Sequence, residues 1–134
     1  MSEHREVGIG INVMEFPEVV TGRTLFLDSP QQVLDFIVRD DAQLTIVISR
    51  GGTTTFVAPA LTVGVKGLIT LQGAPESHLG ILSREYGIPC VMSVVFNEGV
   101  ETERGEIVPA DGTLVTLDVT AVPQGRVLIA ESGD

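Results

Sequence analysis

Hydrophobic and polar positions along the chain form short extended runs that alternate with helical ones. Continuous or loosely alternating apolar runs predict strands, whereas apolar positions three or four residues apart predict helices. The nearly unbroken apolar runs at residues 44–49 and 89–96 are typical of strands buried on both faces. The predicted strands are residues 7–16, 24–27, 44–49, 67–71, 89–96, 106–108, 113–119 and 126–129.

Three segments between these strands predict helices. The order Asp28-Ser29-Pro30 places a capping residue directly before a proline of the first turn, and the helix closes at Asp40-Asp41. A second helix is predicted over residues 53–63, where Pro59 kinks the helix or delays its start. The third begins at Ser77 and stops at Gly87. The apolar stripe of the first helix consists of Val33, Leu34 and Ile37.

Strand and helix alternate in the middle of the chain, whereas both ends are rich in strands. This order predicts a mixed α/β domain in which a βαβ core is parallel and the C-terminal strands are antiparallel. All 134 residues are expected to form one domain, 1–134. The connections predicted are turns at Thr21-Gly22, Asp111-Gly112 and Pro123-Gln124-Gly125, an exposed loop at residues 97–105 and a frayed end at residues 131–134.

The composition of the chain excludes several classes of binding partner. Aromatic residues make up only 4% of the chain, so valine, isoleucine and leucine must supply most of the core. The formal net charge of −10 repels nucleic acids and anionic membrane surfaces, and no apolar run reaches the length of a membrane span. Cys90 is the single cysteine, which excludes an internal disulfide, and the N-terminus lacks a signal-peptide pattern. The expected location is the cytoplasm.

One stretch, residues 67–89, carries the candidate chemistry. A short apolar run leads through a loop containing Gly73 to Ser77, whose hydroxyl is suited to cap a helix. His78 then lies in the first helical turn, where free N–H groups and the helix dipole favour an anion. An imidazole nitrogen can attack a phosphoryl group and form a reactive P–N bond. The stretch therefore indicates phosphoryl chemistry at His78.

The same stretch resembles the phosphohistidine swivelling domain of the phosphoenolpyruvate-utilising enzymes. Ala74 and Glu76 depart from the family pattern, which has a second glycine and a threonine at these positions. Weaker similarity extends to residues 53–61, 111–118 and 125–127, so the resemblance spans nearly the whole chain. The positions in register with the family pattern are Gly67, Ile69, Thr70, Gly73, Ser77, His78, Ile81, Arg84, Gly87, Ile88 and Pro89.

The resemblance implies a swivelling β/β/α domain that acts as a phosphoryl carrier. His78 would accept phosphate at one active site and deliver it at another, with Ser77 and Gly73 binding the phosphate oxygens. The partners expected are separate subunits, one that binds a nucleotide and one that binds phosphoenolpyruvate, pyruvate or another acceptor. Mg²⁺ and ATP or phosphoenolpyruvate are expected on those subunits, and no cofactor or metal on this chain. A homo-oligomer is left open.

Two residues near His78 are expected to modulate it. Arg84 lies six positions further on, about 240° around a helix, so it is assigned to packing of the domain or to docking rather than to the same phosphate. Glu76 would repel phosphate and favour the imidazolium form of His78, which is not nucleophilic. Glu76, together with Ala74, supports a second hypothesis, a degenerate domain with a structural or regulatory role. A third is an unrelated α/β binding protein with an accidental match.

The remaining candidates are assigned no chemistry. His4 is placed in a flexible start, and Cys90 is read as a buried structural thiol because no base partner is evident. Gly51-Gly52-Thr53-Thr54 is followed by no lysine, as a phosphate-binding Walker loop would require, and is read as a turn and a cap. Four carboxylates without metal-ligand spacing are taken as solvated charges: Asp40, Asp41, Glu101 and Glu103.

Overall fold

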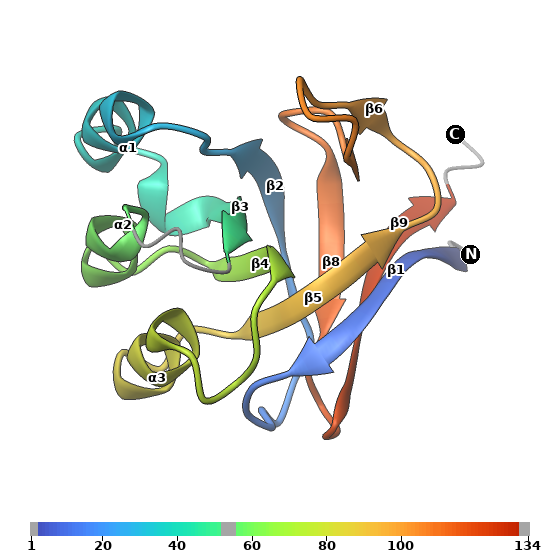
Figure 1. Ribbon diagram of the computed structural model, residues 1–134. Helices are drawn as coiled ribbons and strands as arrows, with labels where there is room; N and C mark the ends of the chain where they lie inside the picture. Colours follow the sequence, from blue (N-terminus) through green and yellow to red (C-terminus); the bar gives the residue numbers. More distant parts are fainter. Residues whose placement is uncertain (1–2, 52–55, 132–134) are drawn as a thin grey trace.

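The computed structural model describes residues 3–51 and 56–131. Seven of its strands form one closed sheet in the order β1-β5-β4-β3-β2-β8-β9, with β9 paired to β1, and β6 and β7 form a separate two-stranded ribbon (Figure 1). The strands are β1 (Glu3–Asn12), β2 (Val20–Phe26), β3 (Thr45–Gly51), β4 (Gly67–Gln72), β5 (Cys90–Phe96), β6 (Val100–Glu101), β7 (Ile107–Val108), β8 (Leu114–Asp118) and β9 (Gln124–Glu131).

Four consecutive strands, β2 to β5, pair in parallel. The helices α1 (Pro30–Ile37), α2 (Ala58–Thr62) and α3 (His78–Glu85) connect these strands and lie together on one side of the sheet (Figure 1). A short 3₁₀ turn, Ala42–Leu44, precedes β3. The strands β1, β8 and β9 join the sheet through antiparallel pairing. The sheet is therefore mixed, which confirms the predicted mixed α/β class.

The core is divided by the parallel strands into two clusters. Successive side chains of a strand point to opposite faces. Ile46 and Ile48 of β3 accordingly lie inside the closed sheet with Leu117, whereas Val47 packs toward the helices with Phe36. All seven residues of β3 are buried, which confirms the expectation of a strand buried on both faces. The prediction was wrong at Leu44, which belongs to the preceding 3₁₀ turn and is 65% exposed.

The helix starts follow from local chemistry. Ser29 caps α1, its hydroxyl accepting a hydrogen bond from the N–H of Gln32 at 3.2 Å, and a proline occupies the first turn as predicted. A proline also lies in the first turn of α2, so the predicted delayed start is confirmed, while residues 53–55 lie outside the described part.

The assignment of Leu34 to the apolar stripe of α1 was wrong. Its side chain is 57% exposed, because the buried pair Val33 and Phe36, three residues apart, defines a different face.

Several strand limits differ from the sequence-based prediction. β1 begins at Glu3, so His4 lies opposite Ala130 of β9 and the expected flexible start was wrong. Thr21 and Gly22 lie within β2, not in a turn, because β8 pairs with them. The predicted turn at residues 123–125 ends earlier, since β9 starts at Gln124. Each strand is lengthened by a partner distant in sequence.

The segment predicted as an exposed loop, residues 97–105, contains β6, which pairs with β7. A buried ion cluster ties this hairpin to the sheet. Arg50, only 6% exposed, pairs with Asp28 after β2 and makes two bonds, of 2.7 and 2.8 Å, to Glu106, which immediately precedes β7. These two carboxylates hold the pKa of Arg50 above its ordinary value against the opposing effect of burial. The hairpin is therefore fixed by charge as well as by backbone pairing.

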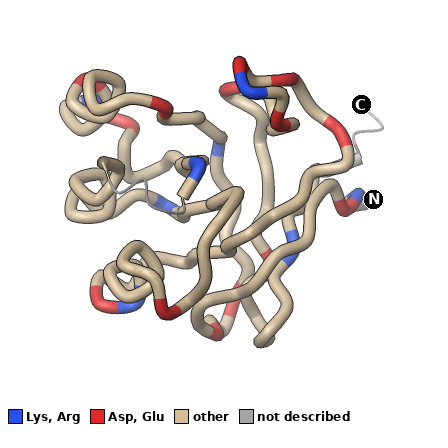
Figure 2. Tube along the Cα trace, viewed as in Figure 1, with Lys and Arg blue, Asp and Glu red and all other residues tan. Residues whose placement is uncertain are grey.

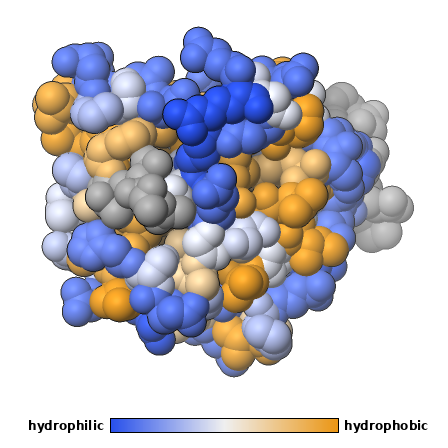
Figure 3. Space-filling model, viewed as in Figure 1, coloured by the Kyte–Doolittle hydropathy of each residue, from blue (hydrophilic) through white to orange (hydrophobic). Residues whose placement is uncertain are grey.

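The surface combines scattered acid with one apolar area. Acidic residues occur throughout the trace and outnumber basic ones, 18 to 8 (Figure 2). Hydrophobic residues gather on the face over β5 (Figure 3), where Val95 is 78% exposed and lies opposite Ile9 of β1. The prediction that β5 is buried on both faces is therefore wrong at Val95. None of the helices in the described ranges has the length and apolar character needed to cross a membrane.

One surface ion pair predicts a pH dependence of stability. Hydrogen bonds from Thr120 and Arg126 lower the pKa of Asp118 to about 2. Because the folded-state pKa is depressed, this stabilisation is fully present above the ordinary value of 3.8 and is lost as the pH falls toward about 2. The urea midpoint of Asp118→Asn should therefore fall less steeply than that of the wild type across this interval. Asp40→Asn, at an exposed residue elsewhere, is the control and should follow the wild type.

Candidate functional site

The candidate site is the loop that leaves β4 and the first turn of α3. Gly73 opens the loop in a left-handed conformation, at φ +109°, which favours glycine. The N–H of Ser77 donates to the carbonyl of Ala74 at 2.8 Å, which closes the loop before the helix. The hydroxyl of Ser77 accepts a hydrogen bond from the N–H of Gly80 at 3.4 Å, so the predicted N-cap is confirmed.

His78 is the first residue of α3, and its side chain is exposed. The N–H of Ile81 donates to the carbonyl of Ser77 at 2.9 Å, the first bond of the regular helical pattern. The N–H groups of His78 and Leu79 precede this bond and have no intrahelical carbonyl available. Free N–H groups at the positive end of a helix dipole form an anion site. The structure thus brings an accessible imidazole beside backbone donors suited to phosphate oxygens.

A second layer under the loop holds it in place. Ser93 of β5 adopts the left-handed conformation, at φ +54°, and its hydroxyl donates to the carbonyl of Gly73 at 2.5 Å. The neighbouring Met92 places its sulfur 3.9 Å from the Ser77 hydroxyl. A local irregularity of β5 therefore positions both ends of the loop that carries the candidate site.

Gly80 allows the loop to pass close to the helix. A Cβ atom added there would lie 2.3 Å from the carbonyl oxygen of Pro75 and 3.0 Å from that of Ala74. Real Cβ atoms do not approach backbone atoms at 2.3 Å. Only glycine therefore lets residues 74–75 fold back over the first turn beside His78.

Arg84 lies on the exposed side of α3, away from the first turn. One guanidinium nitrogen approaches the carbonyl of Pro75 at 3.5 Å, so the side chain reaches back along the helix to the loop. The contact lies within the domain, and the packing role expected for Arg84 stays a prediction. A docking role for its charge stays a prediction.

Glu76 precedes the cap residue and is exposed. Within the described ranges its carboxylate forms no hydrogen bond or ion pair. A carboxylate just before a helix is stabilised by the same dipole that attracts a phosphate. Glu76 can therefore compete with an incoming phosphoryl group, although water and salt screen an exposed charge.

The other sequence candidates lie elsewhere. Cys90 is buried, and burial raises the pKa of its thiol to about 12, so it stays protonated and structural, as expected. Asp41 is exposed and pairs with Arg39, and Asp40, Glu101 and Glu103 are exposed as predicted. In the described part of the chain no three His, Cys, Asp or Glu side chains are grouped to hold a metal. Residues 52–54 of the glycine-threonine loop lie outside the described ranges.

Sequence reasoning missed Gly80, Met92 and Ser93. An isolated glycine within a helical pattern is a signal of close packing, and it could have identified Gly80. The left-handed conformation of Ser93 leaves no such signal, because serine adopts it only under tertiary constraint. The roles of His78, Ser77 and Gly73 toward phosphate stay predictions.

Gly80→Ala should displace the loop and destabilise the domain. Forcing atoms into a filled space costs about 1–3 kcal/mol, although alanine is the better helix former. Urea unfolding should show the loss of stability, and amide NMR should show its largest shifts at residues 74–79. Glu85→Ala, at the exposed end of α3, is the control and should leave both unchanged. Equal or greater stability of Gly80→Ala would contradict the close packing described here.

Comparison with known proteins identifies the family of the chain. No curated protein shows a significant match. A family model described as "PEP-utilising enzyme, mobile domain" matches residues 42–121, which is more than half of the chain and includes β3, α2, β4, α3 and β5. The matched range contains the loop at Gly73, the cap at Ser77 and the exposed His78. The chain therefore belongs to the mobile-domain family of the phosphoenolpyruvate-utilising enzymes.

Proposed function

We propose that this chain is a swivelling β/β/α domain that carries a phosphoryl group on His78. The observation that carries the proposal is the exposed imidazole at the first position of α3, within the range matched by the mobile-domain family. The family suggests a phosphoryl-carrier role, and the free N–H groups of the first turn suit the charge of a bound phosphate. Accessibility matters because a carrier must meet two different reaction sites.

The proposed step is a transfer between two oxygen atoms by way of nitrogen. The lone pair of one imidazole nitrogen attacks the phosphorus, a P–N bond forms, and the P–O bond to the donor breaks with both electrons leaving on the donor oxygen. In the second half an acceptor oxygen attacks the same phosphorus, and the P–N bond breaks. The electron pair returns to His78. Ser77 and the backbone around Gly73 would hold the phosphate oxygens.

The proposal requires partners that supply donor and acceptor. We place ATP or phosphoenolpyruvate, together with Mg²⁺, on separate nucleotide-binding and phosphoenolpyruvate-, pyruvate- or acceptor-binding subunits. The support is the chemistry of the described site, which has one nucleophile and backbone donors. A reducing cytoplasm fits the protonated, buried Cys90.

A second candidate function rests on Glu76. The carboxylate occupies the position before the cap and adds negative charge where phosphate would bind. In this case the chain is a degenerate mobile domain with a structural or regulatory role. The two candidates share the same fold and differ in whether His78 takes up phosphate at a useful rate.

Phosphohistidine formation tests the first candidate. The purified protein is incubated with lysate of its source and labelled ATP or phosphoenolpyruvate, and phosphate that is labile in acid but stable in base is measured. We expect label on the wild type and on His4→Gln, and none on His78→Gln. His4 is a matched control because it is the other histidine of the chain and is also exposed. Equal labelling of His78→Gln would contradict the assignment, whereas no label from either donor would favour the degenerate domain.

The rate of labelling tests the influence of Glu76. A carboxylate near an incoming phosphate in water opposes it by roughly 1 kcal/mol, which corresponds to about a fivefold change in rate. Glu76→Gln and Glu76→Thr should therefore be labelled on the order of fivefold faster than the wild type at low salt, with a smaller difference at high salt. Glu85→Gln removes an equal charge from the far end of α3 and should not change the rate. A rate unaffected by all three changes would show that Glu76 does not restrain His78.

A further inference from the structure

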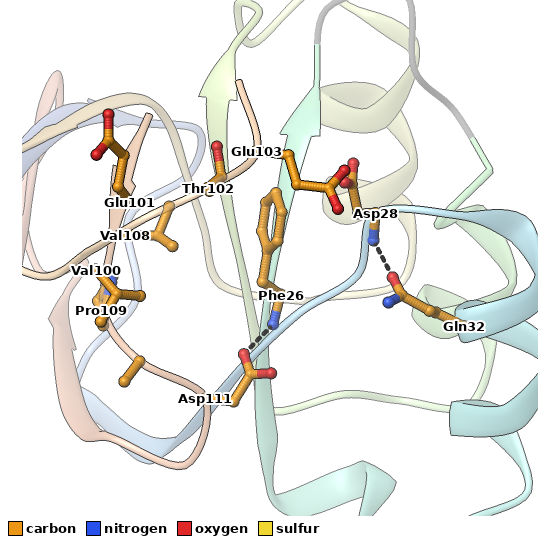
Figure 4. Close-up of a pocket in the computed structure, with 11 residues that line it drawn as sticks. Phe26, Asp28, Gln32, Val100, Glu101, Thr102, Glu103, Val108, Pro109 and Asp111 are labelled. Carbon is orange, nitrogen blue, oxygen red and sulfur yellow. Dashed lines mark hydrogen bonds between the residues drawn. The ribbon is translucent and has the colours of Figure 1, made fainter. Parts of the chain in front are cut away.

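A pocket lies between the β6–β7 hairpin and the end of β2, away from His78. Its volume is about 350 Å³, and its walls come from the hairpin, from the loop after β7 and from the segment joining β2 to α1. Figure 4 shows the side chains arranged around Phe26, with Glu103 and Asp28 on one side and Glu101 on the other. The sequence and the proposed function leave this pocket unexplained.

The pocket is lined by apolar groups as well as by charge. The ring of Phe26 and the side chains of Val100 and Val108 face it, and Val100 is 50% exposed. The guanidinium carbon of Arg50 already lies 5.3 Å from the centre of the Phe26 ring. Phe26 therefore already makes a cation–π contact with one guanidinium within this molecule.

The carboxylates at the rim of the pocket differ in whether they already have a partner within the chain. Asp28 is paired with Arg50, and one oxygen of Asp111 accepts the N–H of Phe26 at 2.9 Å (Figure 4). Glu101 and Glu103 are exposed, and in the described ranges neither takes part in a hydrogen bond or ion pair. Within the described residues no cation is ion-paired with Glu101 or Glu103, so both carboxylates can accept hydrogen bonds from an external cation.

We propose that this pocket binds an arginine side chain presented by a partner polypeptide. A planar guanidinium can stack on an aromatic ring and pair with carboxylates through several N–H groups, whereas an ammonium offers a compact point charge. The net charge of −10 attracts a basic surface at long range. Among the described residues Arg5, Arg39, Arg50 and Arg126 are ion-paired within the chain, whereas Arg23, Arg84 and Arg104 form no ion pair, so a second copy of this chain is the alternative occupant that the test has to exclude.

The position of the pocket fits a docking surface. Because β2, β3 and β4 run in parallel, the segment after β2 that carries Asp28 lies at the same edge of the sheet as the loop after β4 that leads to His78. A polypeptide whose arginine occupies the pocket would approach this edge. Arginine binding does not require that His78 carry phosphate, so the two proposals can fail separately.

Amide NMR titration of the whole chain with a blocked tripeptide, acetyl-Gly-Arg-Gly-amide, tests the proposal. We expect saturable shifts at residues 26–28 and 100–111, with a dissociation constant on the order of 1 mM. The lysine tripeptide should bind at least about threefold more weakly, because its ammonium lacks the planar stacking face. The citrulline tripeptide, which keeps the shape but lacks the charge, should not saturate.

Two matched variants give the decisive comparison. Glu101→Gln/Glu103→Gln should weaken arginine binding about tenfold, whereas Glu15→Gln/Glu18→Gln removes the same charge from an exposed loop outside the pocket and should leave the affinity unchanged. Phe26→Leu should weaken binding with all carboxylates kept. The dispersed amide spectrum of each variant reports whether it is folded.

Three results would overturn the proposal. Equal loss of affinity in both double variants would mean that the tripeptide responds only to net charge. Tighter binding of free L-arginine than of the blocked tripeptide would mean an amino-acid site and not a docking site. Shifts of residues 100–111 that depend on protein concentration without peptide would make a second copy of this chain the occupant.

Discussion

Parallel pairing of four consecutive strands is the constraint on which the rest of this molecule depends. Parallel neighbours cannot be joined by a tight turn, so each connection must cross the sheet, and α1, α2 and α3 provide these crossings. The helices cover one face of β3, and the closed sheet covers the other, which is why this strand is wholly buried. The same pairing brings the carboxyl ends of β2 and β4 to one edge. The loop after β4 carries the His78 site, and the segment after β2 forms one wall of the pocket beside the β6–β7 hairpin.

A buried cation, Arg50, lies at the same edge of the sheet. Arg50 ends up almost without solvent at the end of β3, where an unpaired guanidinium would be strongly unfavourable. Asp28 and Glu106 neutralise it, and Glu106 belongs to the hairpin formed by β6 and β7. The ion pair between Arg50 and Glu106 therefore fixes the position of the hairpin relative to β3. In this arrangement Glu101 and Glu103, which form no ion pair within the described residues, lie at the rim of the pocket.

The features that could be predicted from the sequence are the local ones. The caps at Ser29 and Ser77 and the buried run of β3 depend on neighbours in the chain, and all three are confirmed. The early start of β1 and the pairing of β6 depend on β9 and β7, whose register a local pattern does not contain. In the site, the motif identifies His78 and Ser77, whereas the need for Gly80 arises only when residues 74–75 fold back over the helix.

The geometry of the His78 site and its electrostatics are separable. The Ser77 cap, the turn at Gly73 and the fit at Gly80 together fix where an anion can meet backbone donors, and none of them involves the Glu76 carboxylate. Glu76 is exposed on a side chain with several rotamers, so it can move aside, and its repulsion of phosphate is screened by salt. In the proposed carrier, charge at this position would therefore change how fast His78 takes up phosphate, whereas the backbone geometry would determine whether phosphate can bind there. The two candidate functions, carrier and degenerate domain, thus share one fold and differ in how fast His78 would take up phosphate.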